Sequence, residues 1–341
     1  MISINQKRES MYRAKIAGAG HFVPERVVTN FDLEKMMDTS DAWIRERTGI
    51  QERRFVMDGE NNVDIAEKAS RMALEHAGKK PEDIDFIIFA TLSPDYFFPG
   101  TGCLLQHRLG IPGVGALDIR NQCSGFVYGI SIADQFIKTG VYKNILVVGS
   151  EVQSRGLDLT TRGRDVSVLF GDGAGAAIVD RCDDPGRGII TTHLHADGRH
   201  AKELWCEDPG SQKNPRLTHE LLESSSIFGY MNGKYVFKYA VTKFPEVIEE
   251  ALAMAGIDKN ELDLVIPHQA NMRITEAVRM RLGLPEEKVY SNIQKYGNTT
   301  AASIPIALSE AIAEGKIREK SLVCLAAFGS GFTWASALLR W

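Results

Sequence analysis

The stretch AGKKPEDIDFIIFA, residues 77–90, returns in altered form as AGIDKNELDLVIPH, residues 255–268. Each copy leads from a helix end marked by glycine into an apolar run typical of a buried strand. Two further pairs follow in the same order. Helix ends in TG and EG precede ILVVG and SLVCLAAFG, and then FGDGAGAAIV at 170–179 resembles FGSGFTWASAL at 328–338. Three matches in one order indicate two copies of one α/β unit.

Apolar runs and amphipathic stretches alternate along the chain, as is typical of an α/β protein. Turn and cap residues set the bounds of the elements that we expect. The expected strands are 14–19, 86–91, 114–118 and 145–149, and the expected helices are 31–37 (with Asn30 as N-cap), 62–77 (ending at Gly78), 100–109 and 125–138.

The repeat divides the chain into an N-terminal half, 12–182, and a C-terminal half, 183–341. Residues 1–11 are polar and are expected to form an N-terminal extension, with Met11 as a second possible start. The segment 183–232 has no match in the first half and is rich in Gly, Pro, His and charge. We therefore expect a loop-rich insertion there, where functional residues often gather.

Composition excludes several classes of function. The net charge of the 341-residue chain is −4, which argues against a general nucleic-acid binder. No apolar run is long enough to span a bilayer, and the polar N-terminus does not resemble a secretory signal. Five cysteines without a CxxC spacing indicate free thiols, which fit a cytoplasmic protein without a zinc site. His193, His195 and His200 are interpreted as a solvated loop, and a metal site there is disfavoured because no cysteine or carboxylate cluster completes it.

The repeat relates two candidate functional residues. Cys123 lies 17 residues before Gly140, and Asn298 lies 17 residues before Gly315, so we expect them at equivalent helix N-termini. His268 follows an apolar strand of the second copy. Open α/β sheets place their sites at such strand ends. The repeat therefore predicts that these three residues meet.

Each residue has a functional and a structural interpretation. Cys123 in NQCSGF stands before a helix, whose free N–H groups favour a thiolate and a lowered pKa. Alternatively, it is a small buried hydrophobe. His268 in IPHQAN is either a catalytic donor or a hydrogen-bonded structural histidine. Asn298 in YGNTTAAS is either an oxyanion donor or a turn and cap residue.

Two glycine-rich stretches need different explanations. FGDGAG lacks the strand–turn–helix context and later acidic residue of a dinucleotide fingerprint, so nucleotide binding is rejected. FGSG, residues 328–331, is predicted to press its backbone against the site. The backbone N–H groups of Cys123 and Ser330 then become candidate oxyanion donors.

Together these residues resemble the β-ketoacyl-acyl carrier protein synthase III family, the initiating condensing enzymes of fatty-acid synthesis. The resemblance runs from about Tyr12 to Trp341. Its motifs are WIRERTGI (43–50), CSGF (123–126), LFGDGAGA (169–176), PHQANMRI (267–274), YGNTTAAS (296–303) and FGSGFTWASAL (328–338). It implies a thiolase-like fold of two duplicated halves in five layers, αβαβα.

The resemblance also implies a reaction. Cys123 would take the acyl group of an acyl-CoA, and malonyl-acyl carrier protein would lose CO₂. His268 and Asn298 would stabilise the resulting enolate, which attacks the acyl-cysteine to give a 3-oxoacyl-carrier protein. No cofactor or metal is implied, because acyl-CoA is a substrate.

Further roles come only from the resemblance. It implies that Trp43, Arg47, Arg164 and Asn271 bind CoA. It implies that Phe98 reaches across a homodimer interface and limits acyl length. Gln122, a departure from the family, is assigned to the acyl pocket as well. Carrier-protein docking is assigned to a basic patch: Lys238, Arg273 and Arg281.

Two departures from the family bear on substrate choice. Asn121 and Gln122 precede the nucleophile where small residues are more frequent, and Ser330 replaces a frequent glycine. A related synthase that uses a longer or unusual acyl-CoA in polyketide, quinolone or specialised lipid synthesis is therefore an alternative. A non-catalytic partner subunit is disfavoured by the intact Cys123, His268 and Asn298. A thiolase is disfavoured because Cys324 lies outside the required Gly-rich turn.

Overall fold

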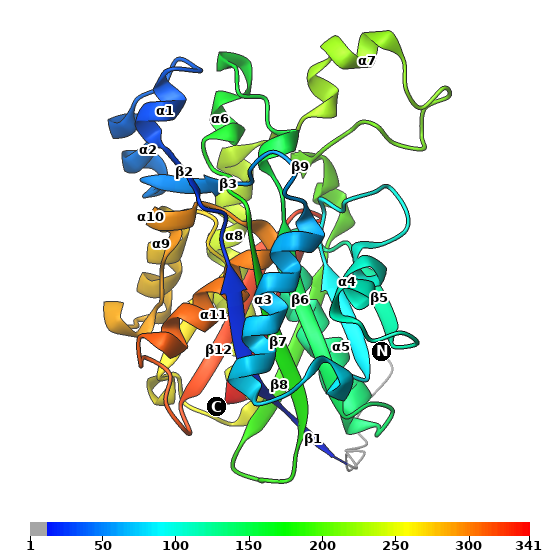
Figure 1. Ribbon diagram of the computed structural model, residues 1–341. Helices are drawn as coiled ribbons and strands as arrows, with labels where there is room; N and C mark the ends of the chain where they lie inside the picture. The colour runs from blue at the N-terminus through cyan, green and yellow to red at the C-terminus, as the bar shows by residue number, and fades with distance from the viewer. Residues whose placement is uncertain (1–11) are drawn as a thin grey trace.

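The computed structural model describes residues 12–341, so the expected extension 1–11 lies outside the described residues. Two sheets form its frame (Figure 1). The first has the order β1-β7-β6-β4-β5, with β1 at Arg13–Phe22, β4 at Phe86–Ala90, β5 at Gly115–Ile119, β6 at Asn144–Glu151 and β7 at Gly173–Cys182. The second has the order β11-β12-β13-β8, with β8 at Gly188–Ala196, β11 at Leu264–Pro267, β12 at Leu322–Gly329 and β13 at Thr333–Arg340.

Helices complete five layers. Apolar side chains of α5 (Gly125–Lys138) and α11 (Ser303–Ala313) share one core with both sheets, so these helices lie between them. The outer face of the first sheet packs on α3 (Asn62–Ala77) and α4 (Thr101–Leu109). That of the second packs on α8 (Gly233–Ala255) and α9 (Met272–Leu282). The expected αβαβα arrangement is confirmed.

The two sheets repeat one topology. Reading each from its antiparallel edge gives β1-β7-β6-β4 and β8-β13-β12-β11. The matched sequence segments lead into β4 and β11, into β6 and β12, and into β7 and β13, as the repeat predicts. The parallel edge strand β5 has only a bridge as counterpart, between Val265 and Val289.

Several smaller elements add to the two main sheets and their helices. A two-stranded sheet and two helices carry residues 26–55: β2 (Arg26–Thr29), α1 (Asn30–Glu34), α2 (Asp41–Thr48) and β3 (Glu52–Phe55). The others are α6 (Arg164–Ser167), β9 (Leu204–Trp205), α7 (His219–Glu223), β10 (Tyr230–Met231) and α10 (Ile293–Tyr296). Asn30 is not the N-cap of α1. The N-cap is Thr29, whose side chain accepts from the Asp32 N–H. The buried Asn30 amide donates to Ile50 O instead.

The segment 183–232 is less loop-rich than expected, because its first part is β8, which pairs with β13. The interpretation of His193 and His195 as a solvated loop is wrong. Both lie on β8 and face Glu250 of α8, at 3.3 and 2.6 Å. The sequence misled here because β8 pairs with β13, 137 to 152 positions further along the chain, and no local pattern reports that pairing.

Within residues 12–341, no group of three or more His, Cys, Asp or Glu side chains is arranged to hold a metal ion. None of the helices in that range is both long and apolar enough to cross a membrane.

Candidate active site

Cys123 sits in a tight bend between β5 and α5. The 3₁₀ turn Gln122–Ser124 precedes α5, and Gln122 has a φ of 41°, a left-handed conformation that costs free energy for a residue with a Cβ. Gly329, at the end of β12, lies against this turn. A Cβ added there would come within 2.6 Å of Cys123 Cβ, so the close approach requires glycine. The FGSG backbone therefore presses on the thiol, as predicted.

The expected equivalence of Cys123 and Asn298 is wrong. The counterpart of the turn Gln122–Ser124 is the 3₁₀ turn Thr300–Ala302 ahead of α11, and Thr300 also has a positive φ, 51°. Cys123 thus corresponds to Ala301. Counting back from the glycine after each helix failed because α11 has 11 residues and α5 has 14, so α11 is about one turn shorter.

Burial governs the protonation of Cys123. Only 8 % of the residue is exposed. Burial raises the pKa of the thiol to about 12, with a further rise from Glu151, against the lowering by the N–H groups of Cys123 and Ser330. The expected lowered pKa is therefore wrong for the free protein, because desolvation outweighs the helix terminus. The N–H groups of Cys123 and Ser330 nevertheless reach the thiol and partly offset this rise.

His268 follows β11 and is 1 % exposed. Its Nδ1 lies 2.6 Å from Ser303 Oγ, which also accepts from the Gln269 N–H. We assign the Ser303 hydroxyl proton to this contact, which leaves the proton of the neutral ring on Nε2. Nε2 has no hydrogen-bond partner, and burial lowers the pKa of His268 to about 3. His268 is thus a neutral donor with a free N–H.

Asn298 is fixed by its own backbone. Its N–H donates to Leu169 O at 2.8 Å, and its carbonyl accepts from the Gly171 N–H at 3.1 Å. The side-chain Oδ1 accepts from the Thr300 N–H at 2.9 Å. The oxygen of the amide is thus engaged by the backbone, and the amide nitrogen is the atom left free for a ligand in the cavity.

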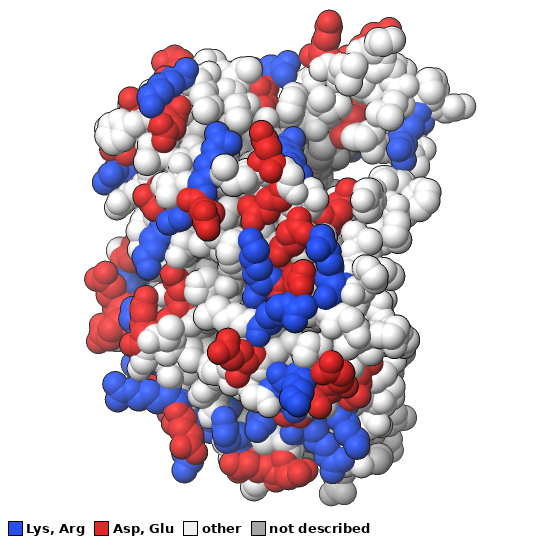
Figure 2. Space-filling model, in the orientation of Figure 1, with Lys and Arg blue, Asp and Glu red and all other residues white. Residues whose placement is uncertain are grey.

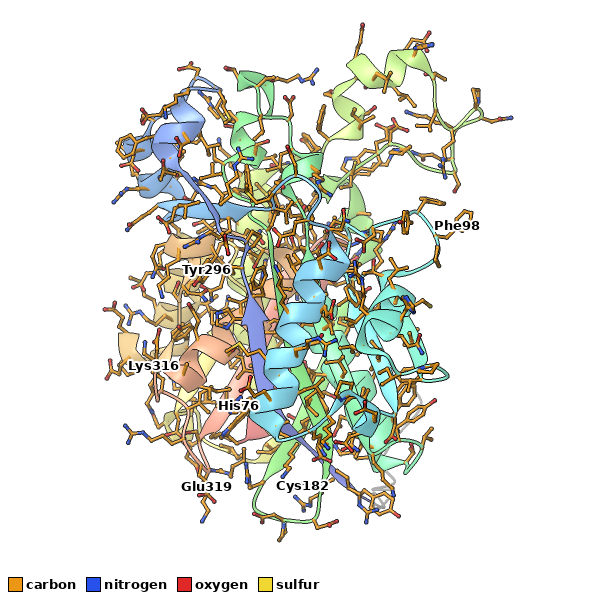
Figure 3. All side chains as sticks on the ribbon, viewed as in Figure 1. His76, Phe98, Cys182, Tyr296, Lys316 and Glu319 are labelled. Carbon is orange, nitrogen blue, oxygen red and sulfur yellow. The ribbon has the colours of Figure 1, made fainter. Side chains whose placement is uncertain are left out.

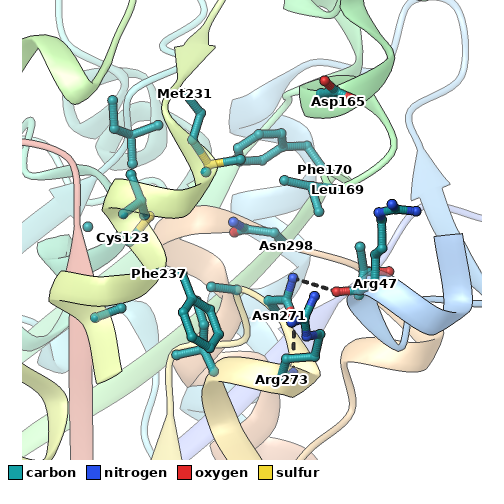
Figure 4. A pocket seen from close by; sticks show the side chains of 18 of the residues that line it. Arg47, Cys123, Asp165, Leu169, Phe170, Met231, Phe237, Asn271, Arg273 and Asn298 are labelled. Atoms are coloured by element: carbon teal, nitrogen blue, oxygen red, sulfur yellow. Dashed lines mark hydrogen bonds between the residues drawn. The ribbon is translucent and has the colours of Figure 1, made fainter. Parts of the chain in front are cut away.

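These three side chains line one cavity of about 810 Å³. Figure 4 shows Cys123 and Asn298 within it, with Arg273 and Asn271 nearer Arg47. Eight of the predicted residues line the cavity: Trp43, Arg47, Cys123, Arg164, His268, Asn271, Arg273 and Asn298.

The outer part of the cavity is aromatic and basic. The guanidinium carbons of Arg47 and Arg164 lie 4.5 and 5.0 Å from the centre of the Trp43 ring. Asn271 donates to Arg47 O at 3.0 Å and so ties α9 to α2. Such a ring with two cations suits a planar ligand that carries phosphate.

The remaining predicted residues lie elsewhere. Ser330 and Gln122 flank the cavity without lining it. Phe98 is 80 % exposed on the loop before α4 and does not line the cavity; Figure 3 shows it at the edge of the molecule. Lys238 on α8 and Arg281 on α9 are exposed, and Arg281 donates to Val241 O at 3.4 Å.

Sequence reasoning missed the apolar lining. Val236, Ala240 and Phe244 follow one another at intervals of four on α8 and face the cavity. The interval marks an apolar helix face, but not whether that face meets a core or a cavity. Leu204 and Met231, from the β9–β10 ribbon, and Phe328 complete this wall.

Comparison with known proteins places this site in context. A family model described as 3-oxoacyl-[acyl-carrier-protein] synthase III matches residues 117–198, and its C-terminal model matches residues 252–341. The β-ketoacyl-[acyl-carrier-protein] synthase III of Caldanaerobacter subterraneus is 47 % identical over 96 % of this chain and 98 % of its own.

Two solved structures are also similar. The synthase III of Aquifex aeolicus is 46 % identical, with a TM-score of 0.88 over 96 % of this chain and 100 % of its own. The priming β-ketosynthase of the R1128 polyketide biosynthetic pathway is 32 % identical, with a TM-score of 0.88 over 98 % of both chains.

Proposed function

This chain belongs to the 3-oxoacyl-[acyl-carrier-protein] synthase III family, and from that premise we propose how its residues act. The enzyme is an initiating condensing acyltransferase of fatty-acid synthesis. It joins an acyl-CoA primer to malonyl-acyl carrier protein with loss of CO₂. The observation that carries the residue assignment is the convergence of Cys123, His268 and Asn298 on one cavity.

Acyl transfer comes first. Cys123 Sγ attacks the thioester carbonyl of acyl-CoA, and the N–H groups of Cys123 and Ser330 stabilise the tetrahedral oxyanion. The carbon–sulfur bond to CoA then breaks. CoA leaves as the thiol, with the proton that Cys123 gives up. The buried, neutral thiol therefore loses its proton only as substrate arrives.

Decarboxylation and condensation follow. The malonyl thioester loses CO₂, and its carbonyl oxygen accepts hydrogen bonds from His268 Nε2 and Asn298 Nδ2 as the enolate forms. The enolate carbon attacks the acyl-cysteine, and the 3-oxoacyl-carrier protein is released. The Cys123 thiolate takes up a proton from water. None of these steps needs a cofactor or metal.

Substrate binding follows from the cavity. We assign CoA to Trp43, Arg47, Arg164 and Asn271, at the outer end. The acidic carrier protein is assigned to Arg273, Lys238 and Arg281, because Arg273 lines the cavity and the other two cations are exposed on α8 and α9, the helices that border it. Arg273 lies 5.7 Å from the ring of Phe237, next to Lys238 in the chain.

We further propose that the protein is a cytoplasmic homodimer divided into halves at 182/183, where the first sheet ends. Free cysteines support the compartment. Figure 2 shows few charges along the edge where the loop before α4 lies, and Tyr96, Phe97 and Phe98 are 59, 67 and 80 % exposed there. Such an apolar patch suits a second subunit. Phe98 of each subunit would then close the acyl pocket of the other subunit, the pocket to which we also assign Gln122.

A second candidate is a priming synthase that takes a longer acyl-CoA. The similarity to a polyketide priming enzyme and the apolar wall of α8 favour it. Mass spectrometry of the protein after incubation with acyl-CoAs of increasing length tests both. We expect one acyl adduct, on Cys123, that is absent from Cys123→Ala. The preferred length separates an acetyl-primed enzyme from the alternative, and equal labelling of Cys123→Ala would refute the assignment.

A further inference from the structure

The turn Gly329–Phe332, here called the oxyanion turn, brings the Ser330 N–H to Cys123 and is held from outside the catalytic centre. The Phe332 N–H donates to Asp197 O at 2.9 Å, and the Asp197 N–H donates to Phe332 O at 2.8 Å. Ser330 Oγ donates to Leu204 O. The segment 197–204, between β8 and β9, therefore supports this turn.

His200 lies at the centre of that segment and contacts two other elements. Its ring centre is 4.4 Å from that of Tyr239 on α8 and 5.5 Å from that of Phe332 on the oxyanion turn. Its Nδ1 is 3.0 Å from the hydroxyl of Tyr235, also on α8. Its Nε2 is 3.4 Å from the carboxylate of Asp197, and only 12 % of the side chain is exposed. The solvated loop expected for this histidine is wrong.

The hydrogen bonds through His200 have a direction. The phenol of Tyr235 keeps its proton near neutral pH, and its oxygen lies closer to His200 Nδ1, at 3.0 Å, than to the Tyr239 hydroxyl, at 3.4 Å. The negative charge of Asp197, 3.4 Å from His200 Nε2, favours the tautomer that carries its hydrogen on Nε2. Nδ1 then accepts from the Tyr235 hydroxyl. The Tyr235 hydroxyl thus donates to His200 Nδ1, and His200 Nε2 faces the Asp197 carboxylate on the other side of the ring.

The contacts of His200 with Tyr235, Tyr239 and Phe332 join the cavity wall to the oxyanion turn. On α8, Val236 and Ala240, next to Tyr235 and Tyr239, line the cavity. At the other end, the backbone of Asp197 pairs with Phe332, which is fully buried. Sub-ångström placement of an oxyanion donor matters, because a misplacement of about 1 Å can cost 10²-fold in rate.

We propose that His200 is a positioning residue for acyl transfer. By accepting from Tyr235 and packing on Phe332, it holds the Ser330 N–H on the oxygen of the tetrahedral intermediate. This rests on the function proposed above for Cys123 and Ser330. Acyl transfer from CoA and attack on the acyl-cysteine use the oxyanion turn. Decarboxylation uses His268 and Asn298 and does not need it.

The two half-reactions provide the test. Acylation of Cys123 is followed by rapid quench and mass spectrometry, with the primer acyl-CoA found in the length panel. Malonyl-carrier protein decarboxylation is followed separately in a Cys123→Ala background. His200→Leu and Tyr235→Phe should each slow acylation about tenfold or more, with an unchanged KM for acyl-CoA. Decarboxylation should stay within about twofold of the parent, because its donors lie elsewhere.

Matched variants separate positioning from packing. His200→Asn keeps an acceptor near the place of Nδ1 and should recover most of the acylation rate. The double variant His200→Leu/Tyr235→Phe should acylate no more slowly than either single variant, because both substitutions remove the same hydrogen bond, from the Tyr235 hydroxyl to His200 Nδ1. His195→Leu removes another partly buried histidine with a carboxylate partner, Glu250, and should change neither half-reaction.

Two outcomes would overturn the proposal. Equal losses in both half-reactions would mean general destabilisation rather than control of the oxyanion turn. Unchanged acylation in both His200→Leu and Tyr235→Phe would mean that the turn needs no such support. By contrast, a wild-type protein that forms no adduct on Cys123 would refute the proposed function itself, and the role of His200 with it.

Discussion

Cys123 and Ala301 occupy the same place in the two halves of the molecule. Each is the middle residue of a 3₁₀ turn before a central helix, and each follows a residue with positive φ. The thiol and the methyl group thus mark one duplicated position, and only the copy in the first half bears the side chain that we propose as nucleophile. Asn298 lies three residues before Ala301, which places its amide in the cavity of Cys123.

Moving the thiol to the duplicated position should not move the activity. Ala301 is 1 % exposed and does not line the cavity. In Cys123→Ala/Ala301→Cys, the new thiol would have no route to acyl-CoA. We expect no acyl adduct by intact-protein mass spectrometry, whereas Cys103→Ala, which removes an exposed thiol, should label like wild type. An adduct on residue 301 would show that the duplicated turn is itself competent.

The donor roles of His268 and Asn298 predict a separation of the half-reactions. His268→Ala and Asn298→Ala should still form the acyl-enzyme, because neither acts on Cys123. Decarboxylation should fall by about 10²–10³ in each. Loss of acylation with decarboxylation preserved would reverse the assignment.

The pH profile of decarboxylation gives an independent check on His268. Its pKa is lowered from 6.5 to about 3, so the ring stays neutral from about pH 5 upward. The rate in a Cys123→Ala background should therefore be flat between about pH 5.5 and 8. A step near pH 6.5 that vanishes in His268→Gln would show that the ring titrates and that its burial is relieved in the complex.

The two ends of the substrate cavity should respond to different substitutions. Trp43→Ala removes the ring between Arg47 and Arg164, and should raise the KM for acyl-CoA about tenfold or more. Arg273→Glu reverses an exposed charge that we assign to docking, and should mainly raise the KM for malonyl-carrier protein and flatten its salt dependence. Steady-state kinetics with each substrate varied in turn measures both. Equal effects of Arg273→Glu on both substrates would exclude a docking role.

Local sequence signals predicted the frame well. The bounds of α3 and α5 match the expected helices, because Gly78 and the small residues after Cys123 set their ends. The meeting of Cys123, His268 and Asn298 at one cavity was also predictable, since each of these residues follows a strand or turn of the repeat. The expected equivalence of Cys123 and Asn298 was wrong because α11 is about one turn shorter than α5. A count of residues along the chain cannot show where that turn is missing.

The burial and contacts of individual residues were harder to predict than the elements on which they lie. The raised pKa of Cys123 depends on burial and on Glu151, which lies 28 positions further along the chain. The roles of His195 and His200 depend on partners on α8 and β13, distant in sequence. Such long-range contacts set pKa values and cavity walls, and no local pattern reports them.

Glu151, at the end of β6, should make stability depend on pH. It is fully buried and accepts from Ser93 Oγ at 2.6 Å, yet burial raises its pKa from 4.5 to about 7. Between these values the unfolded chain has lost the proton that the folded protein keeps, so stability falls as pH rises. The loss should be on the order of 3 kcal/mol. Urea unfolding at about pH 4.5 and 7.5 measures it, and Glu151→Gln should remove this slope because its amide does not titrate. If wild type and Glu151→Gln lose stability equally over that range, Glu151 is ionised in the folded protein and its hydrogen bonds outweigh its burial.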